Sequence, residues 1–172
     1  MAYVIFDTET TGLSPHMGDR IIEIAAVRVV NGRVTDTFDE LINPNRPLSP
    51  EAARVNGITE AMVKDAPTAS VVIPQFLEFV GSDTLVAHNA EFDMAFLAAE
   101  MRRLGLDPAG LSPALCTVEL ARKELPDLER HSLEHLIQHF EISVERRHRA
   151  LDDVLATAQV FLRLHQEEPT LF

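Results

Sequence analysis

Acidic side chains in three separate segments of this 172-residue chain are the residues best suited to chemistry. They are Asp7 and Glu9 near the N-terminus, Asp93 in the middle of the chain, and Asp152 and Asp153 near its end, where His148 precedes them. Carboxylate oxygens are hard ligands that suit Mg²⁺ or Mn²⁺, and no cysteine pair or histidine cluster accompanies them as in a zinc site. A histidine beside such a site can accept the proton of an attacking water. These residue types predict metal-assisted hydrolysis of a phosphodiester.

The first acidic pair follows a short apolar run, residues 2–6, which is typical of a buried strand. Side chains two positions apart on a strand point to the same face, so Asp7 and Glu9 can share one or two cations at the strand's end. Gly12 follows, and a glycine allows the backbone to turn close to a ligand. An isolated Asp-x-Glu is far more often a turn cap beside a solvated acid, so this pair needs support from other segments.

Asp93 lies where a second apolar run, residues 84–87, gives way to a helix. His88 and Asn89 form the expected turn between them, and the helix then presents one apolar face. That face consists of Phe92, Ala95, Phe96, Ala99 and Leu104. Asp93 is expected in the first helical turn, where the positive end of the helix dipole favours a carboxylate. The same placement explains an aspartate at position 93 even if this residue binds no metal.

The third segment opens a terminal helix, expected to run from about residue 150 to about residue 165 with a single apolar stripe. His148 precedes this helix, and Asp152 and Asp153 lie in its first turns. Helical phase alone does not choose between the two aspartates as a ligand. A loop histidine among arginines is an equally simple explanation of His148.

Taken together, the three segments resemble the DEDDh 3′–5′ exonucleases of the ribonuclease H-like fold. The resemblance rests on three motifs that occur in the family's order and cover nearly the whole chain. They are Asp-x-Glu-Thr-Thr-Gly at 7–12, His-Asn-Ala-x-Phe-Asp at 88–93 and His-x-Ala-x-x-Asp at 148–153. The last motif selects Asp153 over Asp152. Within the family the chain looks most like the proofreading epsilon subunit of bacterial DNA polymerase III and its stand-alone relatives.

The resemblance implies an α/β fold, a ribonuclease H-like mixed five-stranded sheet flanked by helices, in one domain over residues 1–172. It implies a metal-dependent 3′–5′ exonuclease that releases nucleoside 5′-monophosphates from DNA 3′ ends, single-stranded or frayed, in proofreading or repair. The family's ligands for two divalent cations, Mg²⁺ or Mn²⁺, correspond to Asp7, Glu9, Asp93 and Asp153, and its proton acceptor corresponds to His148.

The same resemblance implies which side chains surround the terminal nucleotide. They are Thr10, Thr11, Gly12, Leu13, Asn56, His88, Asn89 and Phe92. The residues after Glu9 are expected to offer hydroxyl or backbone donors, and Leu13 to wedge against the base. Asn56 belongs to a segment, residues 55–59, that the family places beside the bound 3′ end.

The remaining elements follow from local patterns. Residues 21–30 and 33–42 predict an antiparallel hairpin around a type I′ turn at Asn31-Gly32. Residues 43–50 contain three prolines and predict a loop. Helices are expected at 50–54, 59–63, 70–79, 117–125 and 132–140.

Composition limits the partners and the compartment. The net charge is −12, with 15 Lys and Arg against 27 Asp and Glu. Binding a long duplex requires many cationic contacts with phosphates, so we expect a protein that grips a few terminal nucleotides and takes short substrates or is delivered by a partner. A single cysteine, Cys116, suits a reducing cytoplasm, and no apolar run reaches membrane-spanning length.

Three other functions remain open from the sequence. An oligoribonuclease or RNA 3′-end trimming enzyme uses the same carboxylates but accepts the 2′-hydroxyl. A catalytically silent nucleic-acid-binding adaptor shows gaps in the ligand set, and none is visible. A metal-dependent phosphatase releases inorganic phosphate.

The C-terminal residues Leu171-Phe172 resemble the ends of short peptides that grip the bacterial sliding clamp, and a terminus packed back on the domain is the competing explanation. Almost no chain follows the terminal helix, so no polymerase-binding tail is expected.

Overall fold

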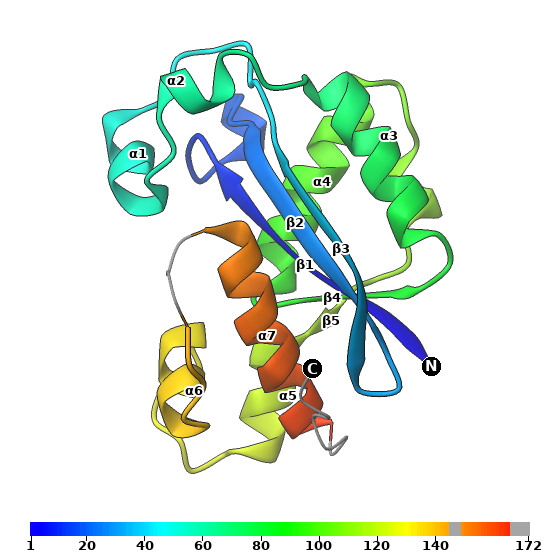
Figure 1. Cartoon of the computed structure of the whole chain (residues 1–172), viewed down its shortest axis with the longest axis vertical. Coiled ribbons are helices and arrows are strands. Elements are labelled where there is room, and N and C mark those ends of the chain that lie inside the picture. The colour runs from blue at the N-terminus through cyan, green and yellow to red at the C-terminus, as the bar shows by residue number, and fades with distance from the viewer. Residues whose placement is uncertain (145–148, 166–172) are drawn as a thin grey trace.

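The computed structural model describes residues 1–144 and 149–165 (Figure 1). Five strands form one sheet in the order β3-β2-β1-β4-β5. Their bounds are β1 Ala2–Thr10, β2 Ile21–Val30, β3 Arg33–Leu41, β4 Thr84–Ala87 and β5 Leu115–Cys116. The first three strands are antiparallel neighbours, whereas β4 runs parallel to β1 and β5 parallel to β4. The mixed five-stranded sheet implied by the resemblance is confirmed.

Helices cover both faces of this sheet (Figure 1). Their bounds are α1 Pro50–Asn56, α2 Glu60–Val63, α3 Ala69–Val80, α4 Ala90–Arg103, α5 Thr117–Glu124, α6 Leu133–His139 and α7 Ala150–Leu164, with 3-10 turns at η1 Pro15–Met17 and η2 Pro108–Gly110. α3 and α4 pack on one face, and α7 packs on the other. α5 and α6 contact the far side of α7, so α7 is sandwiched between them and the sheet.

The central strand β1 is buried on both faces, and its alternation determines where the acidic residues point. Val4 and Phe6 pack in the core beside α3 and α4, whereas Tyr3 and Ile5 pack beside α7. Because side chains alternate along a strand, the Asp7 side chain points to the same face as those of Tyr3 and Ile5, which is the face that α7 covers. Helix α7 therefore faces the first acidic residues directly.

Most local predictions are confirmed, with two informative differences. In the β2–β3 hairpin, Asn31 and Gly32 have positive φ angles of 51° and 75°, as a type I′ turn requires. The strand expected at residues 2–6 continues to Thr10, because Asp7 and its successors keep pairing with β2. Strand β5 was not predicted from its residues, since two residues show no periodicity. No helix among the described residues is long and apolar enough to cross a membrane.

Candidate metal and active site

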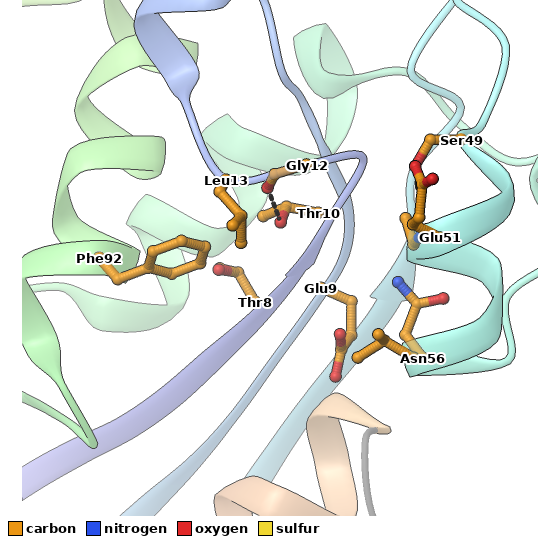
Figure 2. Close-up of a pocket in the computed structure, with 11 residues that line it drawn as sticks. Thr8, Glu9, Thr10, Gly12, Leu13, Ser49, Glu51, Asn56 and Phe92 are labelled. Carbon is orange, nitrogen blue, oxygen red and sulfur yellow. Dashed lines mark hydrogen bonds between the residues drawn. The ribbon is translucent and has the colours of Figure 1, made fainter.

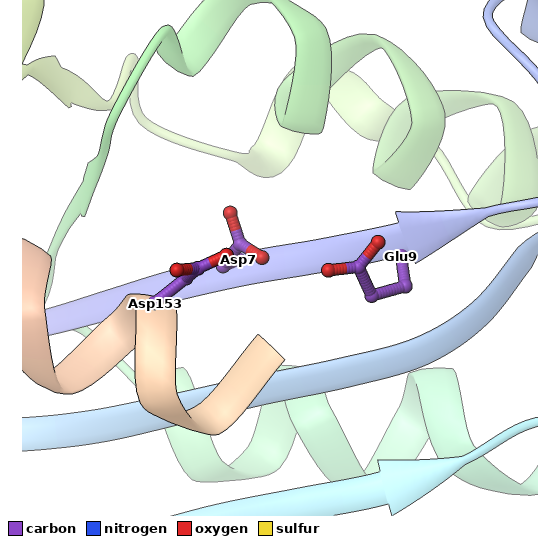
Figure 3. A group of neighbouring side chains, drawn as sticks. All are labelled: Asp7, Glu9 and Asp153. Carbon is purple, nitrogen blue, oxygen red and sulfur yellow. The ribbon is translucent and has the colours of Figure 1, made fainter. Parts of the chain in front are cut away.

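Three of the candidate ligands meet where β1 passes under the start of α7 (Figure 3). One ligand atom from each of Asp7, Glu9 and Asp153 lies within 4.8 Å of the others. Asp153 is only 6% exposed, because Ala150 and Val154 on the same helix are packed into the core against the sheet. Side chains more than 140 positions apart in the sequence thus form one acidic group.

The fourth candidate, Asp93, reaches the same strand from the opposite face. It lies in the first turn of α4 and is 3% exposed. Its Oδ1 accepts hydrogen bonds from the backbone nitrogen of Thr8 at 3.0 Å and from the Thr8 hydroxyl at 2.7 Å. Thr8 was not predicted as a site residue, although strand alternation already places it on the α4 side, between Asp7 and Glu9.

Burial raises the pKa of Asp7, Glu9 and Asp93, and repulsion from neighbouring acids raises the pKa of Asp7 and Glu9 further. Burial, followed by the charges of Asp93, Glu9 and Asp153, raises the pKa of Asp7 well above its ordinary value. Burial and the charges of Asp153 and Glu23 raise the pKa of Glu9 to about 8. Burial raises the pKa of Asp93 to about 7, against the lowering effect of the Thr8 hydrogen bonds. Buried acids that repel one another are a suitable environment for divalent cations.

These pKa values predict that the metal-free protein becomes less stable as the pH rises. Glu9 has a pKa of about 8 in the folded chain against 4.5 in an ordinary environment, so the folded state binds more protons between these values. Protonated Glu9 contributes fully to the stability of the folded state below about pH 4.5, and this contribution is lost as the pH rises through about 8. In EDTA, the melting temperature of Glu9→Gln should therefore exceed that of wild type by a margin that grows between about pH 5 and pH 8. Saturating Mn²⁺ should abolish this margin, and a margin independent of pH would contradict the prediction.

A pocket of about 490 Å³ opens beside the acidic group (Figure 2). Glu9 belongs to both the group and the pocket, so the two are continuous. Leu13 and Phe92 lie on one side of the pocket in Figure 2, and helix α1 forms the other side. Leu13 is 85% exposed, which is unusual for a leucine and leaves its side chain available to a ligand.

Five of the eight residues predicted to contact the nucleotide line this pocket, and three do not. Those that do are Thr10, Gly12, Leu13, Asn56 and Phe92. Asn89 lines a neighbouring hollow of about 270 Å³ that shares Leu13 and Phe92 with the pocket. His88 lies outside the pocket lining, and its Nδ1 is 2.8 Å from the Thr117 hydroxyl.

Thr10, Thr11 and Gly12 were expected to offer backbone or hydroxyl donors to the nucleotide, and the structure shows both threonine hydroxyls donating within the chain. The Thr10 hydroxyl donates to the Gly12 carbonyl at 2.6 Å, and the Thr11 hydroxyl donates to Asp19 at 3.0 Å. Both threonines hold the loop after β1. At Gly12 an added Cβ would lie 2.4 Å from the Asp19 carboxylate, so any other residue there would displace the Asp19 side chain that accepts from Thr11.

The α1 side of the pocket extends beyond the segment 55–59 that was expected beside the 3′ end. Val55 of that segment lines the pocket, and Ser49, Glu51 and Ala52 are additional residues. The Ser49 hydroxyl contacts the Thr11 carbonyl at 3.3 Å and accepts from the backbone nitrogen of Ala52 at 3.1 Å, so it joins α1 to the end of β1. This contact across the fold has no local sequence signal.

The choice between the two C-terminal aspartates is supported by their surroundings. Asp153 is the one that lies with Asp7 and Glu9. Asp152 is less buried, and its charge acts on Asp39 and Arg149 instead. His148 lies outside the described residues, as do Leu171 and Phe172.

A mixed sheet with helices on both faces, and carboxylates from three motifs gathered at the end of its central strand, defines the class of ribonuclease H-like nucleases. The chain belongs to the exonuclease family, whose model matches residues 4–161.

Two curated relatives and one solved structure show how close the match is. The chain is 43% identical over 162 residues to a PolC-type DNA polymerase III of Caldanaerobacter subterraneus, covering 94% of this chain and 11% of the relative. It is 46% identical over 168 residues to a DNA polymerase III subunit epsilon-like protein of Rhodobacter capsulatus, covering 95% of this chain and 24% of the relative. Exonuclease X, solved in complex with 5′ overhanging duplex DNA, is 34% identical with a TM-score of 0.74, covering 98% of this chain and 94% of that one. The chain thus spans a small part of the curated relatives but nearly the whole of Exonuclease X.

Proposed function

We propose that residues 1–172 form a single nuclease domain that acts as a metal-dependent 3′–5′ exonuclease and releases nucleoside 5′-monophosphates from DNA 3′ ends. The observation that carries this proposal is the continuity of a nucleotide-sized pocket with an acidic group at the end of β1. Membership of the exonuclease family supports the reaction type. The names of the DNA polymerase III relatives support DNA as the substrate and proofreading or repair as the setting.

Asp7, Glu9, Asp93 and Asp153 are the residues that would hold two divalent cations. The donor set fits, because all four side chains offer hard oxygen ligands, and the charges of Asp93 and Asp153 raise the pKa of Asp7 and of Glu9 when no cation is bound. Bound Mg²⁺ or Mn²⁺ supplies an acidified water and charge stabilisation for the leaving 3′ oxygen. Because the pKa values of Glu9 and Asp93 lie near neutrality, cation binding releases protons and strengthens as the pH rises.

The side chains of the pocket position the terminal nucleotide. Leu13 and Phe92 offer apolar surface to its base, and Leu13 is exposed enough to separate the last base from the one before it. The second hollow, on the side of Asn89, suits that preceding base. Glu9 belongs to both the pocket and the acidic group, so the sugar-phosphate end of the nucleotide would reach the cations held there, and His148 would accept the proton of the attacking water.

The composition and the C-terminal residues guide the remaining parts of the proposal. A charge of −12 is unfavourable for gripping long duplexes, so the enzyme takes single-stranded or frayed ends. The cytoplasm is the proposed compartment, because a single cysteine suits a reducing environment. Delivery by a sliding clamp through Leu171-Phe172 is a further part of the proposal. It requires that a protein of residues 1–172 binds the clamp and that deletion of residues 169–172 removes this binding without changing hydrolysis of oligonucleotides.

Matched DNA and RNA oligonucleotides with a 5′ label test the reaction in Mg²⁺, Mn²⁺ or EDTA. We expect a ladder that shortens from the 3′ end, mononucleotide products, faster turnover of DNA and no turnover in EDTA. Circular single-stranded DNA is the control, because an exonuclease leaves it intact. Faster turnover of RNA than of DNA would favour the oligoribonuclease. Release of inorganic phosphate would favour the phosphatase, and binding without hydrolysis would favour the adaptor.

A further inference from the structure

A fifth carboxylate, Glu23, is buried beside the site and has no role in the proposal above. It lies on β2 directly opposite Glu9 of β1 and is 1% exposed. Its charge raises the pKa of both Asp7 and Glu9. A buried carboxylate close to other acids is costly unless something pairs with it, so its partner is informative.

That partner is the start of helix α7. The Arg149 guanidinium donates to Glu23 through Nη2 at 2.6 Å and through Nε at 3.2 Å. The backbone nitrogen of Ala150, the first residue of α7, donates to the other carboxylate oxygen at 3.1 Å. The first N–H groups of a helix have no partners within the helix. Arg149, the residue before the helix, makes no side-chain cap bond, so Glu23 supplies the cap from a neighbouring strand.

The same contacts determine where Asp153 lies. The backbone nitrogen of Asp153 donates to the Arg149 carbonyl at 3.1 Å, which closes the first turn of α7. Glu23 fixes the Arg149 side chain. The Arg149 carbonyl, which accepts from Asp153, is therefore fixed as well, and with it the helical turn that carries Asp153. Any shift of this turn moves the Asp153 carboxylate relative to Asp7 and Glu9.

The charge balance explains why Glu23 is paired with arginine instead of a cation. Two divalent cations would neutralise the four carboxylates that the proposed function assigns as ligands. A fifth unpaired carboxylate would leave an uncompensated negative charge in a buried site. Arg149 compensates it, and Arg149 also lowers the pKa of Glu9. Asp39 and Asp152, which face Arg149 as well, are more exposed than Glu23.

We propose that Glu23 and Arg149 are positioning residues: they hold the first turn of α7 on β2 so that Asp153 stays at ligand distance from Asp7 and Glu9. Glu23 is not itself a metal ligand. This inference rests on the proposed function, because it concerns the geometry of the same site.

Mn²⁺ titration and steady-state kinetics test the pair in Glu23→Gln, Arg149→Lys, Arg149→Ala and the double variant Glu23→Gln/Arg149→Ala. Loss of a residue that orients a metal ligand typically weakens metal affinity about 10–100-fold. We expect this loss in each single variant, because neither glutamine nor lysine reproduces the charged, forked contact. The loss in the double variant should not exceed that of the worse single variant. The KM for oligonucleotide should stay nearly unchanged, because neither residue lines the pocket.

A second buried pair in the chain provides the matched control. Glu100 is also 1% exposed and binds the Arg20 guanidinium at 2.7 and 2.8 Å and a backbone nitrogen at 3.3 Å. It lies on α4 and touches none of the proposed ligands. Glu100→Gln should lower the melting temperature at least as much as Glu23→Gln but leave Mn²⁺ affinity unchanged.

The outcomes separate this inference from the proposed function. Equal loss of Mn²⁺ affinity in Glu100→Gln would show that the effect is general destabilisation. Tighter Mn²⁺ binding in Arg149→Ala would show that Glu23 competes as a ligand. Either result overturns the inference while hydrolysis by wild type still supports the function. Wild type that binds Mn²⁺ without hydrolysing DNA would overturn the function alone, and wild type that binds no Mn²⁺ would overturn both.

Discussion

Asp7→Asn is expected to abolish hydrolysis and, at the same time, to raise the melting temperature of the metal-free protein. The substitution removes a cation ligand, and the charge stabilisation that a metal provides is worth several kcal/mol, so the rate should fall by roughly 10³-fold or more. It also removes a carboxylate whose charged form is disfavoured by burial and by four neighbouring acids. Each gain of about 1 kcal/mol in the free energy of unfolding raises the melting temperature by about 2–4 °C in a protein of this size.

Thermal melts in EDTA and in Mn²⁺, together with hydrolysis rates, measure both effects. Glu9→Gln, Asp93→Asn and Asp153→Asn should lose hydrolysis in the same way. Asp152→Asn is the matched control, since Asp152 faces Asp39 and Arg149, and it should keep most of the activity. An inactive Asp152→Asn beside an active Asp153→Asn would show that the third motif has been aligned wrongly. A lower melting temperature of Asp7→Asn in EDTA would contradict the electrostatic account.

His148→Ala should lower turnover by about 10²–10⁴-fold, the usual contribution of a general base, without loss of metal binding. The prediction rests on the His-x-Ala-x-x-Asp motif, since His148 lies outside the described residues. The carboxylates that would hold the cations remain in this variant, so its Mn²⁺ affinity should match that of wild type. In wild type, turnover should fall as the pH drops below the pKa of the histidine, because a protonated imidazole accepts no proton.

Mn²⁺ calorimetry on His148→Ala is the deciding measurement. His88→Ala is a suitable companion variant, because His88 contacts Thr117 instead of lining the pocket. We expect a smaller loss of turnover in His88→Ala than in His148→Ala. A loss of Mn²⁺ binding in His148→Ala as large as that in Asp7→Asn would make His148 a ligand instead of a base.

The sequence by itself determined the parts of this protein that depend on local periodicity and on motif order. Strand alternation placed Asp7 and Glu9 on one face, and the type I′ turn at Asn31-Gly32 specified the β2–β3 hairpin. The first helical turn after β4 placed Asp93 correctly. These features follow from residues within one element, where spacing and backbone preference decide the geometry.

Only the tertiary structure decided which distant groups meet at the site. Strand β5 has two residues and forms by pairing with β4, so it has no pattern of its own. The α1 side of the pocket depends on the contact of Ser49 with Thr11, 38 positions away. Glu23 lies 126 positions from Arg149, and although the apolar residues around Glu23 on β2 indicate burial, only the packing of α7 reveals its partner. Local sequence determines where a side chain points along its own element, whereas the packing of separate elements determines which side chains become buried together and must therefore be paired.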